Sequence, residues 1–192
     1  MHTQIILRII DALWFILPAY VANSTPVNVS KIQFLERYGK PIDFGRSWRG
    51  ARILGDGKTW RGLFSGILAG TVVGFLQSEF QYRVILSLES IFRDQVIDLP
   101  RMSVGLGFML SLGAIIGDMT GSFVKRRMNI DPGDPAPLLD QLDFVFGAFF
   151  FSWLLTGLLN LEHFFIIVLI TPAIHLLGNF IAFVWKLKRE PW

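Results

Sequence analysis

Five apolar segments alternate with polar stretches along the chain. They run over residues 5–22, 63–82, 102–124, 144–161 and 163–187. A helix needs about 20 predominantly apolar residues to cross a bilayer, and these segments approach or reach that length. The pattern predicts an all-α integral membrane protein with about five transmembrane helices, folded as a single domain over residues 1–192. Residues 85–92 are too few to cross alone, so they would form either an interfacial helix or the end of a longer second helix.

Basic residues concentrate in three stretches of the sequence. Most of the 18 lysines and arginines lie in residues 23–61, in residues 125–143 or in the tail after residue 185. If five helices span, these stretches share one side of the membrane, and the positive-inside rule places that side in the cytoplasm. The N-terminus would then lie outside, the C-terminus would be cytoplasmic, and residues 23–61 and 125–143 would form two polar cytoplasmic loops.

Glycines recur at every fourth position in two of the apolar segments. They are Gly62, Gly66, Gly70 and Gly74 in the second segment, and Gly113, Gly117 and Gly121 in the third. Each set makes a smooth groove that lets another helix approach closely. We favour packing between helices of one chain, and a homodimer face is the alternative.

Composition supports a membrane protein and excludes several other classes. The chain is 52% hydrophobic and its mean hydropathy is +0.49, which is above a typical soluble domain. The absence of cysteine excludes disulfides and thiolate metal sites. Basic loops facing anionic lipid headgroups explain the net charge of +3, so this charge does not indicate a nucleic-acid partner.

Candidate chemistry begins where the third apolar segment ends. Asp118, Ser122 and Lys125 are spaced i, i+4 and i+7, so on a helix they share one face, and Arg126 lies beside them. Asp118 could simply be neutralised by a cation of its own helix. An acid inside an apolar segment is unfavourable, however, and by default it marks a functional site. We interpret these residues as the floor of a polar site, with residues 23–61 supplying its wall.

Two more acids begin the fourth segment. Asp140 and Asp143 could cap a helix, because acids in the first turn suit the helix dipole. One acid would suffice for that. A short, proline-containing hairpin would bring Asp140 and Asp143 opposite Asp118. The three acids would then form a site with oxygen ligands only, and such a site suits Mg²⁺. We interpret Asp131 and Asp134, inside that hairpin, as solvated turn residues.

A glycine-rich stretch, residues 55–62, precedes the second segment. Its Gly-Lys-Thr triplet is not a P-loop, because Arg52 stands where that motif needs glycine and no strand pattern precedes it. Backbone N–H groups at a helix N-terminus, with Lys58 and Arg61 adjacent, could still bind phosphate. The alternative is a basic anchor at the membrane interface, with Trp60 at the level of the headgroups.

These two elements resemble the CDP-diacylglycerol synthase superfamily, and within it the archaeal branch, the CDP-archaeol synthases. The downstream signature is matched by Gly117-Asp118, Ser122, Lys125-Arg126, a Pro/Gly-rich stretch at 132–137 and Asp140-Gln141-Leu142-Asp143. An upstream element is matched by Lys58-Thr59-Trp60-Arg61-Gly62. The histidine of the bacterial signature is absent and Gln141 replaces its usual arginine, which argues against the bacterial branch.

The resemblance implies a multi-pass enzyme of the cell membrane that acts in phospholipid biosynthesis. Such an enzyme is a nucleotidyltransferase that converts CTP and digeranylgeranylglycerol phosphate, an archaeal ether lipid, to CDP-archaeol and pyrophosphate. The implied catalytic residues are Asp118, Lys125, Asp140 and Asp143, of which the three aspartates would hold Mg²⁺, with a second cation left open. The implied substrate-binding residues are Lys58, Thr59, Arg61, Ser122 and Arg126.

Two other functions stand as alternatives. A CTP-dependent polyprenol or lipid kinase would need similar acids and cations, but it would transfer the γ-phosphoryl group and leave CDP. A small ion-coupled transporter would use Asp118 as its ion site. It would also predict internal repeats, and the sequence has none beyond its glycine spacing.

The charge distribution predicts which side of the membrane each polar loop faces. Because the chain has no cysteine, single cysteines placed near Lys40 and Pro135 can serve as accessibility probes. Both should react with a membrane-impermeant thiol reagent only from the cytoplasmic side, because basic loops remain there. Reaction of either probe from outside would place the two loops on opposite sides and exclude a common site.

Overall fold

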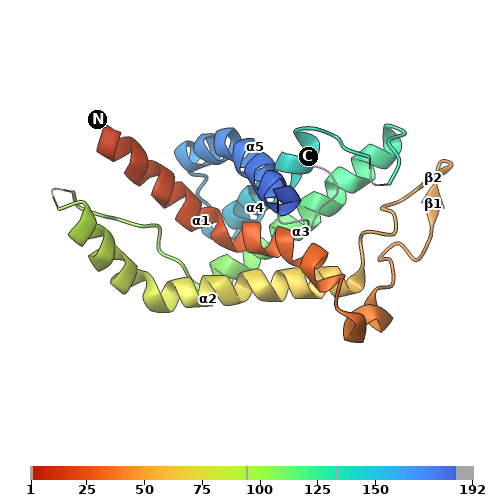
Figure 1. Cartoon of the computed structure of the whole chain (residues 1–192), viewed down its shortest axis with the longest axis horizontal. Helices are drawn as coiled ribbons and strands as arrows, with labels where there is room; N and C mark the ends of the chain where they lie inside the picture. Colours follow the sequence, from red (N-terminus) through yellow and green to blue (C-terminus); the bar gives the residue numbers. More distant parts are fainter. Residues whose placement is uncertain (1, 94, 133, 185–192) are drawn as a thin grey trace.

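A computed structural model describes residues 2–93, 95–132 and 134–184, and over these the chain forms five α-helices (Figure 1). They are α1 (His2–Val29), α2 (Trp60–Ile91), α3 (Val104–Arg127), α4 (Leu139–Thr156) and α5 (Leu161–Val184). A 3-10 helix, η1 (Gln33–Tyr38), and an antiparallel hairpin of β1 (Ser47–Trp48) and β2 (Ala51–Arg52) lie between α1 and α2.

The helices lie at the five apolar segments, which confirms the predicted class of all-α membrane protein. Helices α1 to α4 are each long and apolar enough to cross a membrane, and α5 is apolar from Leu161 to Ile174. Residues 85–91 continue α2 and do not form a separate interfacial helix. The predicted end of the fifth span, at residue 187, and the basic tail lie outside the described residues. The orientation of the helices across the membrane stays a prediction.

Helices α1 and α4 also have different ends from those expected. Helix α1 continues to Val29 instead of ending near residue 22, so the long polar loop begins later. Helix α4 begins at Leu139 and ends at Thr156, where Gly157 adopts a φ of +68°. Glycine often ends a helix in this left-handed conformation, because it has no Cβ to clash. The earlier start places both predicted acids of this segment inside the first turns of α4.

Helix α1 passes through Pro18 without breaking, because another helix replaces the missing hydrogen bond. Proline has no N–H, so the carbonyl of Trp14 has no partner within α1. The buried side chain of Gln77, on α2, donates from Nε2 to this carbonyl at 2.7 Å. A carbonyl without a partner is unfavourable in hydrocarbon, so this contact stabilises α1 and fixes its position against α2.

The glycine groove of α2 packs against α1 and α3 of the same chain. A Cβ atom at Gly66 would lie 2.7 Å from the carbonyl oxygen of Ala22, and one at Gly74 would lie 2.5 Å from the Cα of Gly107. Because no real side chain tolerates such distances, only glycine allows these helices to approach so closely. The interpretation of this groove as an intramolecular contact is confirmed, and a homodimer stays a prediction.

Three glycines of α3, Gly113, Gly117 and Gly121, face α4. Gly113 and Gly147 meet through their backbones, and Gly117 lies against the carbonyl of Asp143. The space that a side chain at Gly121 would fill holds the carboxylate of Asp143. Close packing of two helices therefore sets the position of one predicted acid.

The hydrophobic core lies where α1, α3, α4 and α5 meet. Its fully buried side chains include Ile16, Leu110, Phe144, Val145 and Ile167. The outer face of α2 is different, because it exposes large apolar side chains such as Phe64, Leu68 and Val72. An exposed apolar face suits contact with lipid chains, as expected for a helix at the edge of a membrane bundle.

The contact between α2 and α3 predicts that Gly74→Ala destabilises the protein, because its Cβ would collide with the backbone of Gly107. Overpacking of this kind costs typically about 1–3 kcal/mol. Gly105→Ala is the matched control, since its Cβ would meet only Ser103 Oγ, at 3.9 Å. Alanine favours a helix over glycine by about 1 kcal/mol, so this control should be neutral or stabilising. Thermal melts followed by circular dichroism in detergent measure the difference, and equal melting temperatures would contradict the close contact.

Candidate active site

An ion pair joins the two polar regions of the chain. Lys58 Nζ lies 2.6 Å from Asp118 Oδ2. Lys58 lies just before α2 and Asp118 lies on α3, so residues separated by 60 positions meet at one point. Their side chains are 25% and 27% exposed, which leaves the pair accessible to a charged ligand. The structure thus brings together a residue of each element that the sequence analysis singled out.

A second ion pair links the end of α3 to the start of α4. Lys125 Nζ lies 2.5 Å from Asp140 Oδ1. The other oxygen of Asp140 accepts a hydrogen bond from the backbone N–H of Ala136 at 2.8 Å. Asp140 therefore combines the two roles considered from the sequence, because it stabilises the start of α4 and also contributes to a charged cluster.

Asp143 lies on the face of α4 that packs against α3. Its Oδ1 accepts a hydrogen bond from the next backbone N–H at 2.6 Å, and its Oδ2 occupies the space beside Gly121. The charges of Asp118, Lys58 and Asp140 all act on its carboxylate. All three predicted acids therefore lie near the contact between α3 and α4.

Three carboxylates in one region have the donor chemistry that Mg²⁺ prefers. In this conformation, however, Asp118 and Asp140 are each paired with a lysine. Within residues 2–93, 95–132 and 134–184, no three Asp, Glu or His side chains are grouped so that they could hold a metal ion. The acids fit a divalent cation by chemistry, while the lysines supply the neutralising charge in this arrangement.

Ser122 and Arg126 are buried on α3, beyond Asp118, and each is only 5% exposed. Nε and Nη1 of Arg126 are buried and have no hydrogen-bond partner in the described part of the chain. A buried guanidinium with unused donors is unfavourable, and a bound anion would satisfy those donors through charge-assisted hydrogen bonds. Arg126 is therefore well suited to bind a phosphate group.

Two predicted substrate-binding residues make contacts outside these ion pairs. Thr59 caps α2, because its Oγ1 accepts a hydrogen bond from the backbone N–H of Gly62 at 3.1 Å. Arg61 extends toward Gly39 and lines a cavity at the N-terminal end of α2. The contacts of Thr59 thus give it a structural role, and Arg61 belongs to another part of the surface.

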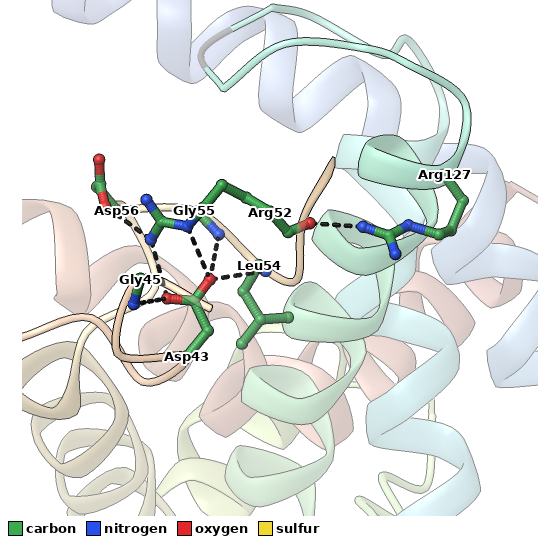
Figure 2. Close-up of polar contacts among 7 residues, drawn as sticks. All are labelled: Asp43, Gly45, Arg52, Leu54, Gly55, Asp56 and Arg127. Atoms are coloured by element: carbon green, nitrogen blue, oxygen red, sulfur yellow. Dashed lines mark hydrogen bonds and ion pairs between the residues drawn. The ribbon is translucent and has the colours of Figure 1, made fainter. Parts of the chain in front are cut away.

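Asp43 organises the long loop between α1 and α2, a role that was not predicted from the sequence. Its buried carboxylate lies 2.9 Å from Arg52 Nη2. It also accepts hydrogen bonds from three backbone N–H groups, those of Gly45, Leu54 and Gly55, at 3.0 to 3.1 Å (Figure 2). Burial alone would raise the pKa of Asp43, but these donors outweigh burial and hold the pKa well below its usual range. Asp43 therefore stays charged and keeps the loop folded.

Arg127 fastens this loop to the end of α3. Its guanidinium donates hydrogen bonds to the carbonyl oxygens of Trp48 at 2.7 Å, Ala51 at 3.2 Å and Arg52 at 2.6 Å. Figure 2 shows the last of these bonds. The guanidinium also lies over the indole ring of Trp48, 5.2 Å from its centroid. The loop that leads into α2 is thus held against α3, which keeps the two halves of the site together.

Sequence signals for these two residues are weak. The spacing of Asp43 and Gly45 is typical of an Asx turn, in which the side chain accepts from the N–H two residues on, and this bond forms. The other partners of Asp43 lie farther along the loop. Those of Arg127 lie more than 70 positions away, so no local pattern indicates them.

The contacts of Asp43 predict that Asp43→Asn loosens the loop, because the amide nitrogen cannot accept a hydrogen bond and the charge opposite Arg52 is lost. Leaving buried backbone donors without an acceptor costs about 1–3 kcal/mol, so the loop should open for cleavage about 10- to 100-fold more often. Asp56→Asn is the matched control: Asp56 also contacts Arg52, at 2.8 Å, but it is 79% exposed and should matter little. Limited trypsin digestion measures both rates, and equal cleavage of the two variants would show that Asp43 does not hold the loop.

Comparisons with known proteins identify the family of the chain. A sequence model of the CarS-like CDP-archaeol synthase family matches residues 4–192. The chain is 45% identical to the CDP-archaeol synthase of Pyrococcus abyssi, covering 96% of this chain and 98% of the relative. It is 44% identical to that of Methanocaldococcus jannaschii, covering 94% and 96%. A solved structure of an intramembrane enzyme for archaeal membrane lipid biosynthesis is 36% identical and matches with a TM-score of 0.69, covering 89% of this chain and 94% of that one. The chain belongs to the CDP-archaeol synthase family.

Proposed function

We propose that this multi-pass membrane protein is a CTP-dependent cytidylyltransferase. It would convert CTP and digeranylgeranylglycerol phosphate to CDP-archaeol and pyrophosphate in ether phospholipid biosynthesis. Membership of the CDP-archaeol synthase family supports the reaction. The long apolar helices support a substrate that reaches the site from the membrane.

The observation that carries this proposal is that two residues on the C-terminal half of α3, Asp118 and Lys125, each form a lysine–aspartate pair with another element. In each pair, Lys58–Asp118 and Lys125–Asp140, the two residues come from different elements, and the side chains are only partly buried. Arg126 adds buried donors that have no partner among the described residues. A ligand with several negative charges can satisfy these donors and compete with the acids for the lysines. A triphosphate beside a lipid phosphate has this chemistry.

The reaction needs little covalent chemistry from the protein. An oxygen of the lipid phosphate attacks the α-phosphorus of CTP, a new P–O bond forms, and the bond to pyrophosphate breaks. The main tasks are to position the two phosphates and to neutralise their charge. Lys58, Lys125 and Arg126 would supply positive charge, and the hydroxyl of Ser122 can donate to a phosphate oxygen.

Asp118, Asp140 and Asp143 would hold Mg²⁺ in the working enzyme. When bound, this ion neutralises phosphate oxygens and stabilises the charge that develops during transfer. The acids themselves support this assignment, because three nearby carboxylates and a triphosphate would repel one another without a compensating cation. We expect one or two divalent cations at these acids.

Isotope labelling of CTP tests the proposed reaction directly. Purified protein receives CTP labelled at either the α- or the γ-phosphorus, with a dialkylglycerol phosphate as acceptor. A cytidylyltransferase places the α-label in the lipid and releases the γ-label as pyrophosphate. A γ-label in the lipid, with CDP released, would show a lipid kinase instead and overturn the proposal.

Replacement of the acids tests the proposed metal ligands. Asp118→Asn and Asp143→Asn keep the shape but remove a charge, so each should lower turnover at least about 100-fold, as loss of a group stabilising transition-state charge does. Asp140→Asn should be nearly as severe. Asp131→Asn and Asp134→Asn are the controls, because both acids are exposed in the turn before α4, and they should be mild.

Wild-type activity should vanish in EDTA and return with Mg²⁺. An active Asp118→Asn enzyme, or full activity without divalent metal, would refute the assignment of these ligands.

A further inference from the structure

A cavity lies at the N-terminal end of α2, and neither lysine–aspartate pair lines it. Its volume is about 580 Å³, and it is lined by three cations, Arg37, Lys40 and Arg61, and by three aromatic residues, Tyr38, Trp60 and Phe64. None of the described residues that line it is an acid. The cavity therefore combines positive charge with a largely apolar wall.

This cavity and the proposed reaction site lie on neighbouring stretches of backbone. The backbone N–H of Trp60 donates to the carbonyl oxygen of Lys40 at 3.1 Å, and the backbone N–H of Ile42 donates to the carbonyl oxygen of Lys58 at 2.8 Å. The side chain of Lys58 is held by α3, whereas Arg61, on the first turn of α2, lines the cavity. The two sites are therefore adjacent but use different side chains.

Among the residues that the structure describes, no acid forms an ion pair with the three cations of the cavity, Arg37, Lys40 and Arg61. Arg37 instead lies over the rings of Phe34 and Tyr38, 5.5 and 4.6 Å from their centroids. Three neighbouring like charges repel one another, so an anion bound between them would be stabilised.

The apolar wall of the cavity continues along the membrane face of α2. Phe64, Leu68 and Val72 follow one another at i, i+4 spacing, so they share one helix face. Their side chains are 64%, 66% and 45% exposed. Because Trp60 begins the apolar helix, the cavity lies at one end of the expected span, where headgroups meet hydrocarbon. A ligand that fits this surface has an anionic head and apolar chains.

We propose that this cavity binds the phosphate of an anionic membrane lipid, with the lipid chains lying along Phe64, Leu68 and Val72. The three cations hold the phosphate, and the rings of Tyr38, Trp60 and Phe64 cover the adjoining glycerol and first methylenes. The site is separate from the transfer reaction. It keeps an anionic lipid at the edge of the helix bundle, next to the loop that carries Lys58.

The test uses the full chain in detergent and a probe that cannot react with CTP. The probe is a diphytanyl ether lipid with a phosphoglycerol headgroup, whose phosphate is a diester, and native mass spectrometry counts bound lipid during a titration. Arg37→Gln combined with Lys40→Gln should weaken binding at least about tenfold, since each basic side chain near an anionic lipid contributes about fivefold. Arg46→Gln combined with Arg49→Gln is the matched control. This control removes the same amount of charge from the same loop, but neither residue lines the cavity. It should therefore bind the lipid as tightly as wild type does.

Further measurements decide between this site and its alternatives. Uncharged diphytanylglycerol should bind equally to wild type and to the cavity variant, which is Arg37→Gln combined with Lys40→Gln. Inorganic phosphate should displace the anionic lipid only at concentrations far above that of the lipid. Lys58→Ala should bind the lipid normally while losing affinity for CTP, which separates this proposal from the proposed reaction. Equal lipid affinity of the cavity variant and the matched control would overturn the proposal. Efficient displacement by inorganic phosphate or by CTP would also overturn it, by assigning the cavity to a free anion or to the nucleotide.

Discussion

The close contact between α3 and α4 determines where the acids of the site lie. Gly113 and Gly147 meet through their backbones, and Gly121 leaves room for the carboxylate of Asp143. Any side chain at these positions would push the helices apart and move Asp143 away from Asp118. The acids are therefore held by helix packing, which is more rigid than a loop.

Charge balance is the second constraint on this region. Three acids, Asp118, Asp140 and Asp143, lie near the two lysines that neutralise Asp118 and Asp140. Such internal pairing lets charged groups remain in a largely apolar bundle without a ligand. Because Lys58 and Lys125 are already paired with acids, a phosphate group that binds either lysine must replace its aspartate partner.

The sequence predicted the five helices because a bilayer requires long apolar segments, and these are visible without any knowledge of packing. It also singled out the polar residues of α3, because helical spacing places Asp118 and Ser122 on one face. The predicted first helix already included Pro18, but its extension to Val29 was not predicted. The sequence also could not show what replaces the hydrogen bond that this proline lacks, because the donor, Gln77, lies 63 positions away from Trp14. Asp43 was missed for a similar reason, since most of its partners meet only when the loop has folded.

The attachment of the long loop to α3 by Arg127 has a mechanical consequence. Transmembrane helices tilt when the thickness of the bilayer changes. The hairpin is fastened to the same helix that carries Asp118 and Lys125. We therefore expect the loop to follow α3 when this helix tilts. Lys58 would then stay beside Asp118 even where the surrounding membrane differs in thickness.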